Sequence, residues 1–95
     1  MVLVIRRLHG NCPVQAEGTV DGKEFYFRAR WEHWTMGIGG DPVDEPEWFR
    51  EAKWGDSPVA AGWMPKDEAR KFIEQCAGDF SAGRPGALFP SSALR

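Results

Sequence analysis

The sequence has no apolar run that approaches the roughly 20 residues a helix needs to cross a bilayer. Its opening, MVLVIRRL, places the arginines after the apolar residues, which is the reverse of a secretory signal. We therefore expect a cytosolic protein without membrane contact. Cysteine is scarce, and a cytosolic chain would keep its two cysteines, Cys12 and Cys76, reduced and packed as small apolar side chains. In a secreted context the two would be able to form a disulfide.

Positive charge is not in excess either. The chain carries 12 Lys and Arg against 14 Asp and Glu, a formal net charge of −2. A general nucleic-acid binder depends on clustered Lys and Arg to neutralise phosphates, so the composition argues against direct nucleic-acid binding. The balance is uneven, because residues 41–56 contain six acidic side chains against two basic ones. We call this run the acidic segment; its net charge is −4.

The clearest structural signal that is present is a hairpin. Asp21-Gly22 lies between two strand-like runs and suits a type I′ turn, in which both central residues take positive φ. A two-residue turn fixes the register of the strands on either side. The predicted apolar-face pairs are Val20 with Lys23, Gly18 with Phe25, Ala16 with Phe27, and Val14 with Ala29. The opposite face is polar and pairs Thr19 with Glu24, Glu17 with Tyr26, and Gln15 with Arg28.

Three further segments are predicted to extend this hairpin into a meander. Residues 2–8 are β-branched and aliphatic enough for a strand, and after Trp31 residues 33–38 alternate polar with apolar side chains until Gly39-Gly40 stops them. Residues 41–47 (DPVDEPE) are a loop by composition. For residues 48–54 we favour a short strand over a helical turn. That strand would place Trp48, Arg50, Ala52 and Trp54 on one side and Phe49, Glu51 and Lys53 on the other.

A helix is predicted in MPKDEARKFIEQCAG, residues 64–78. Pro65 suits its first position, acidic residues follow in the first turn, and Gly78 supplies a stop. The apolar stripe of this helix consists of Ala69, Phe72, Ile73, Cys76 and Phe80.

The helix stripe and the apolar sheet face should pack together, since neither is buried alone. The predicted fold class is α+β, an antiparallel β-meander of four to five strands with one C-terminal α-helix packed on one face. Length and average composition suit one domain, residues 1–80. Residues 81–95 are rich in Pro, Gly and Ser and are predicted to form a flexible tail, in which Leu88 and Phe89 could dock.

Signatures of catalysis are weak. GIGGD lacks the helix and the Lys-Ser/Thr of a phosphate-binding loop. His9 and Cys12 have the H-x2-C spacing of half a zinc site, but the only other candidates, His33 and Cys76, come from separate elements. Cys76 lies near the C-terminal end of the helix stripe, where burial and the helix dipole raise the pKa of a thiol. We predict no metal, no cofactor and no enzymatic activity.

Aromatic residues point instead to a contact surface. Phe25, Phe27, Trp34 and Phe72 are assigned to the core. The rings at 48, 49, 54 and 63 cannot all turn inward, because alternation sends Phe49 away from the two tryptophans of its strand. Some aromatic surface should remain among carboxylates, as protein interfaces favour; the alternative of equal weight is that these rings cover the second face of the sheet. The predicted partner-binding residues are Asp41, Asp44, Glu45, Glu47, Trp48, Phe49, Glu51, Trp54 and Asp56.

The hairpin and third strand (VQAEGTVDGKEFYFRARWEHWTMGIGG), followed by the helix segment (AAGWMPKDEARKFIEQCA), resemble a group of short uncharacterised proteins from proteobacteria and their phages or mobile elements. The shared motifs are structural and carry no activity. Small acidic proteins of such elements are similar in character to anti-CRISPR proteins, which bind a nuclease or surveillance complex and block nucleic acid. The resemblance implies a protein inhibitor in the host bacterial cytosol, with a CRISPR effector subunit as the kind of partner expected.

Two other classes of function stay open at this point. One is a ligand-binding domain or enzyme that uses Arg28, Arg30 and His33 around Tyr26 on the polar sheet face. The other is a structural homodimer in which two sheets meet, so the oligomeric state expected is monomer or homodimer.

Overall fold

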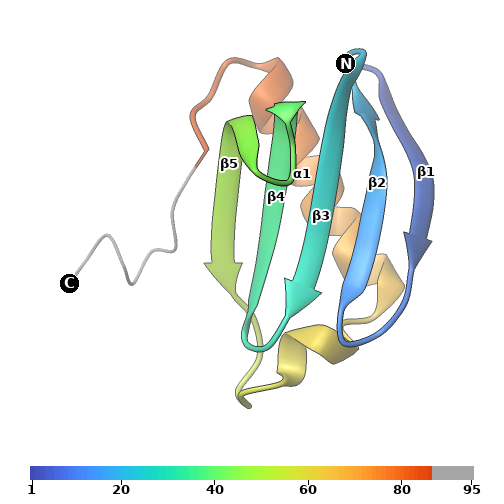
Figure 1. Ribbon diagram of the computed structural model, residues 1–95, viewed down its shortest axis with the longest axis vertical. Coiled ribbons are helices and arrows are strands. Elements are labelled where there is room, and N and C mark those ends of the chain that lie inside the picture. The colour runs from blue at the N-terminus through green and yellow to red at the C-terminus, as the bar shows by residue number, and fades with distance from the viewer. Residues whose placement is uncertain (87–95) are drawn as a thin grey trace.

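The computed structural model describes residues 1–86 and has two layers, a five-stranded sheet and one helix behind it (Figure 1). The sheet is antiparallel, with its strands in chain order β1-β2-β3-β4-β5. This confirms the predicted α+β meander with a C-terminal helix on one face. The elements are β1 (Leu3–His9), β2 (Val14–Val20), β3 (Lys23–Arg30), β4 (His33–Asp41), β5 (Glu45–Lys53), the 3₁₀ turn η1 (Ala60–Trp63) and α1 (Lys66–Ser81).

The β2–β3 hairpin has the predicted register at every pair. Asp21 and Gly22 take φ of 50° and 82°, as a type I′ turn requires. The Asp21 carboxylate also accepts hydrogen bonds from the Val2 backbone N–H at 2.7 Å and the Ser81 hydroxyl at 2.8 Å. These bonds, the Val2 bond first, lower the pKa of Asp21. The turn thus ties the start of β1 to the end of α1.

The core lies between α1 and one face of the sheet. The predicted helix stripe faces it, with Ala69, Ile73 and Cys76 fully buried and Phe72 and Phe80 partly buried. Trp34 on β4 is stacked between Phe27 and Phe72, with ring centroids 5.7 and 4.8 Å away. The core-facing side chains of the sheet include Val14, Ala16, Val20, Phe25, Phe27, Ala29, Met36, Ile38 and Trp48.

Three boundaries read from the sequence are wrong. Strand β4 continues through Gly39-Gly40, and β5 begins at Glu45, inside the segment assigned to a loop. Helix α1 continues through Gly78 and ends instead before Gly83, whose φ is 77°. There the Arg84 N–H bonds to the Asp79 carbonyl at 2.9 Å and the Gly83 N–H bonds to the Phe80 carbonyl at 3.1 Å, which is a Schellman motif.

Residues 82–86, which the sequence assigns to a flexible tail, contact β5. The Trp48 indole N–H donates to the Arg84 carbonyl at 2.8 Å, and Gly86 lies against the backbone of Phe49. The remainder of the predicted tail, with Leu88 and Phe89, lies outside the described residues. Within residues 1–86, no helix has the length and apolar character to span a bilayer.

Candidate functional site: the open face of the sheet

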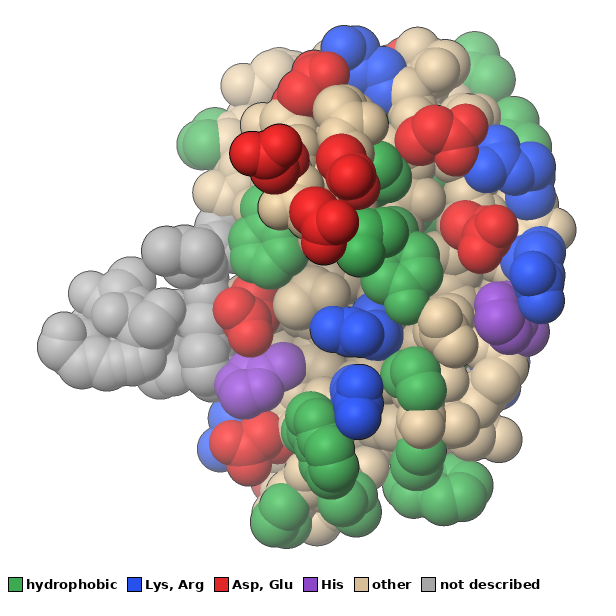
Figure 2. Space-filling model, viewed as in Figure 1, with side chains coloured by type: hydrophobic (Ala, Val, Ile, Leu, Met, Phe, Trp, Pro, Cys, Tyr) green, Lys and Arg blue, Asp and Glu red, His purple; other side chains and the backbone are tan. Residues whose placement is uncertain are grey.

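The sheet face opposite α1 is covered by no element of residues 1–86, and we call it the open face (Figure 1). Alternation places one polar row of side chains from each strand on it. Register aligns Gln15, Arg28, Thr35 and Glu51 across β2 to β5, and aligns Arg30, His33 and Lys53 in the next row. Figure 2 shows a group of acidic side chains in the upper part of this face and basic side chains near its centre, with both kinds also present toward its edges.

A projecting tip stands at one end of the open face. We define the hairpin tip as residues 41–45, which are the connection between β4 and β5 and the strand residue on each side of it. Gly39 and Gly40 take φ of 78° and 60°, and the Pro42 carbonyl lies where a side chain at Gly37 would stand. Because Gly37 belongs to the open face, the tip must fold over that face.

The hairpin tip is held in shape by Asp41, whose carboxylate accepts the backbone N–H groups of Val43 and Asp44, each at 3.1 Å. Asp41, Asp44 and Glu45 are all exposed, and Val43 between them is 64% exposed. The structure therefore brings together three of the predicted carboxylates on a projecting element with one apolar side chain.

Glu47, the next predicted carboxylate, is paired within the chain. It accepts the Lys23 ammonium at 2.9 and 3.1 Å, and this hydrogen bond lowers the pKa of Glu47. Glu51 lies further along β5, opposite Thr35, and Asp56 is exposed in the loop after β5, at the end of that strand away from the hairpin tip. The nine predicted residues therefore do not form one surface.

Two of the three aromatic residues in the predicted site lie on the covered side of the sheet. Trp48 is buried at 8% exposure and meets Phe80 edge to face with centroids 6.3 Å apart, while Trp54 is partly buried against the core. Only Phe49 is turned outward, at 38% exposure on the open face. Strand β5 alternates as predicted, but the side that carries both tryptophans is the one that α1 covers.

The outward tryptophans are Trp31 at 57% and Trp63 at 62% exposure. Trp31 has a φ of 57° in the tight turn between β3 and β4, and Trp63 closes η1. Sequence reasoning did not single out Trp31 as an exposed aromatic residue. The available signal was that Trp31-Glu32 separates two alternating runs by two residues, as Asp21-Gly22 does.

A hollow of about 160 Å³ lies on the open face toward the turn between β3 and β4, the end of β4 opposite the hairpin tip. We call it the cationic hollow; its lining is Arg28, Arg30, Trp31, His33, Thr35 and Glu51. It exists because Thr35 is short while its neighbours in the same row, Arg28 and Glu51, are long. The Arg30 guanidinium lies over the Trp31 ring, 5.1 Å from its centroid. Among residues 1–86, Arg28 has no ion-pair partner.

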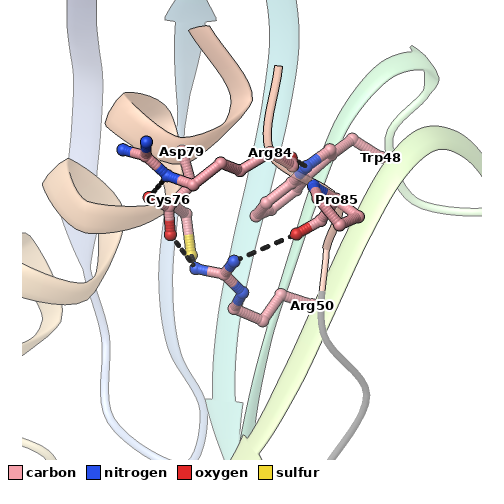
Figure 3. A network of polar contacts seen from close by, with 6 residues as sticks. All are labelled: Trp48, Arg50, Cys76, Asp79, Arg84 and Pro85. Atoms are coloured by element: carbon pink, nitrogen blue, oxygen red, sulfur yellow. Dashed lines mark hydrogen bonds and ion pairs between the residues drawn. The ribbon is translucent and has the colours of Figure 1, made fainter. Parts of the chain in front are cut away.

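A second polar cluster, on the other side of the sheet, is structural (Figure 3). Arg50 Nη1 contacts Asp79 Oδ2 at 2.7 Å, Arg84 Nε contacts Asp79 Oδ1 at 2.9 Å, and Arg50 Nη2 donates to the Pro85 carbonyl at 3.3 Å. Cys76 Sγ lies 3.9 Å from Arg50 Nη1, yet burial raises the pKa of this thiol to about 12. The cluster therefore fastens residues 82–86 to β5 and offers no reactive thiolate.

Residues 1–86 contain no group of three or more His, Cys, Asp or Glu side chains placed to hold a metal ion. No protein-family model matches the chain, no curated protein matches it, and no solved structure matches its fold. The site must therefore be interpreted from its own geometry.

Proposed function

We propose that this protein is a non-enzymatic binding module that contacts another protein through its open face, with the hairpin tip leading. The observation that carries this proposal is the fold of the tip: Gly37 leaves room for Pro42, so three exposed carboxylates and Val43 project above the sheet. A projecting acidic element suits a partner with a basic groove, because complementary charge accelerates and orients association.

The specific form of this proposal is an inhibitor of a nucleic-acid-binding protein, of the anti-CRISPR kind, acting in the host cytosol. The carboxylates of the tip would occupy a groove that otherwise holds phosphates. The apolar contacts would come from Val43 and Phe49, which are the exposed apolar residues in and next to the tip. Trp48 and Trp54 are excluded from this role by their burial.

The test compares two charge-reversed variants with equal net charge. Asp44→Lys/Glu45→Lys changes the tip but leaves Asp41, which shapes it, in place. The matched control, Asp56→Lys/Glu74→Lys, changes two exposed carboxylates outside the tip. Immobilised wild type, tip variant and control are exposed to nuclease-treated bacterial lysate, and each captured protein is identified.

A partner bound by wild type and control but lost from the tip variant supports the proposal. Its purified form should then associate with the wild type more slowly as salt increases, and the tip variant should show a flatter salt dependence. A partner captured equally by all three proteins would contradict the role of the tip.

The cationic hollow favours a second candidate function, the binding of a small anionic ligand. Arg28 and Arg30 project from one face of β3, and Thr35 and His33 lie opposite them on the neighbouring strand β4. Hydrogen-bond donors therefore line the hollow from two strands. Titration with phosphorylated and carboxylated metabolites, monitored by thermal shift, tests this. A stabilisation that Arg28→Ala abolishes supports a ligand site, whereas equal stabilisation of both proteins contradicts it.

A further inference from the structure

We propose that two copies of this chain associate through their open faces in antiparallel orientation, each hairpin tip entering the cationic hollow of the other copy. This inference goes beyond the proposed function and does not depend on it, since it needs no foreign partner. Its basis is that the open face carries a projection and a hollow whose charge and polarity are complementary.

The charges of the two features are opposite. The hairpin tip presents Asp41, Asp44 and Glu45, whereas the hollow has two guanidinium groups against the single carboxylate of Glu51. Lys53 follows Glu51 on the same face of β5 and stands opposite His33, which adds a cation to the rim. Figure 2 shows a group of acidic side chains in the upper part of this face and a pair of basic patches nearer its centre, among other charged side chains toward the edges.

The apolar groups are also placed to meet. Val43, 64% exposed, lies among the carboxylates of the tip, and Trp31, 57% exposed, lies beside the guanidinium groups of the hollow. A tip that enters the hollow would remove both apolar side chains from water, which is favourable. A central apolar contact within a charged rim is the usual composition of a protein interface.

Symmetry requires that both features lie on one face. In a twofold dimer the same surface is used by each copy, so a tip-to-hollow contact made once is made twice. The open face spans all five strands of seven to nine residues each, and a standard interface buries roughly 800 Å² per partner. Because the tip is buried in such a dimer, self-association would compete with a foreign partner that binds the tip.

Sedimentation velocity of the purified chain, over a range of concentrations and at low and high salt, tests the proposal. We expect a reversible dimer whose dissociation constant rises with salt. Asp44→Lys/Glu45→Lys and Arg28→Glu/Arg30→Glu should each weaken the dimer by about a hundredfold or more, because each sets like charges against one another. Asp56→Lys/Glu74→Lys should leave the dissociation constant unchanged.

The decisive sample is an equal mixture of the two charge-reversed proteins. In a heterodimer, the basic tip of Asp44→Lys/Glu45→Lys meets the acidic hollow of Arg28→Glu/Arg30→Glu. The native acidic tip of the second protein meets the native basic hollow of the first. A heterodimer should therefore form although neither protein pairs with itself. All four substituted side chains are exposed, and circular dichroism checks that each variant is folded.

Three results would overturn the proposal: a wild type that stays monomeric at every concentration, a dimer that both variants leave intact, or a mixture that yields no heterodimer. A monomeric wild type whose hollow binds inorganic phosphate, lost in Arg28→Glu/Arg30→Glu, would assign the hollow to a small ligand instead. A failed dimer leaves the lysate capture experiment unaffected, so the two proposals fail separately.

Discussion

Replacing Asp79 by alanine should destabilise the fold through Arg50 (Figure 3). Arg50 Nη1 lies 2.7 Å from Asp79 Oδ2, and the two side chains are only 15% and 20% exposed. Without Asp79 the guanidinium keeps the Pro85 carbonyl at 3.3 Å as its remaining protein oxygen among the described residues, and its Nε already has no partner there. A hydrogen bond to a charged group is worth about 1.5–3 kcal/mol, so the expected loss of unfolding free energy is about 2 kcal/mol.

Thermal and urea unfolding measure this loss, which corresponds to a fall in Tm of about 8–16 °C for a domain of this size. Arg84→Ala is the matched control, because it removes the other partner of Asp79 at 2.9 Å but is 64% exposed. It should cost less than about 1 kcal/mol. Arg50→Met/Asp79→Ala should be less destabilised than Asp79→Ala alone, because no uncompensated cation is left in the cluster.

The effect of Asp79→Ala should also depend on pH. Hydrogen bonds from Arg50 and then Arg84 hold the pKa of Asp79 below its usual range. A carboxylate with a lowered folded pKa contributes stability above its unfolded pKa and loses that contribution as pH falls through the folded value. The gap between wild type and variant should therefore be full at neutral pH and shrink below about pH 4. A gap that is absent at pH 7, or constant down to pH 2, would refute the assignment of this pair as a stabilising contact.

Three further substitutions and one labelling reaction test other parts of the structure. Gly83→Ala should lower the free energy of unfolding by about 1 kcal/mol, because φ is 77° there. Gly78→Ala should raise it by about 0.5–1 kcal/mol, because Gly78 lies in a helix interior with open space around its Cβ. Changes of opposite sign in urea unfolding would confirm where α1 ends. Gly37→Ala should displace the hairpin tip, because the added Cβ would collide with the Pro42 carbonyl. Amide chemical shifts of the tip residues that are the same in the variant and the wild type would contradict this. With a maleimide at pH 7.5, exposed Cys12 should react fully and Cys76, whose pKa burial raises to about 12, should react only on unfolding; mass spectrometry after digestion would detect any early label on Cys76.

Local patterns predicted the fold well where the physical cause is itself local. Asp21-Gly22 tolerates positive φ and sits between alternating runs, so the turn sets a register that the structure reproduces pair by pair. The spacing of Ala69, Ile73 and Cys76 likewise follows from the period of a helix, and these side chains are buried as predicted.

The helix end shows where local reasoning failed. Gly78 and Gly83 are equally plausible stops in the sequence. A glycine ends a helix only where the backbone N–H groups of the following residues can donate hydrogen bonds to the last carbonyls of the helix. Here Arg84 does so after Gly83, in a segment that Trp48 and Arg50 hold against β5. The choice depended on contacts between residues more than thirty positions apart.

The candidate site likewise depended partly on local sequence and partly on tertiary contacts. Alternation alone determined that Trp48 and Trp54 share one side of β5 and Phe49 the other, and composition alone determined that the acidic segment carries the negative charge. Only the tertiary structure decided which side α1 covers, which buried Trp48, partly buried Trp54 and left Trp31 outside. It also placed the Pro42 carbonyl where a side chain at Gly37 would stand, so that the three carboxylates of the tip lie over the open face. Glu47, in contrast, pairs with Lys23. Side-chain direction along a strand is a local property of the backbone, whereas burial depends on which distant element packs against it.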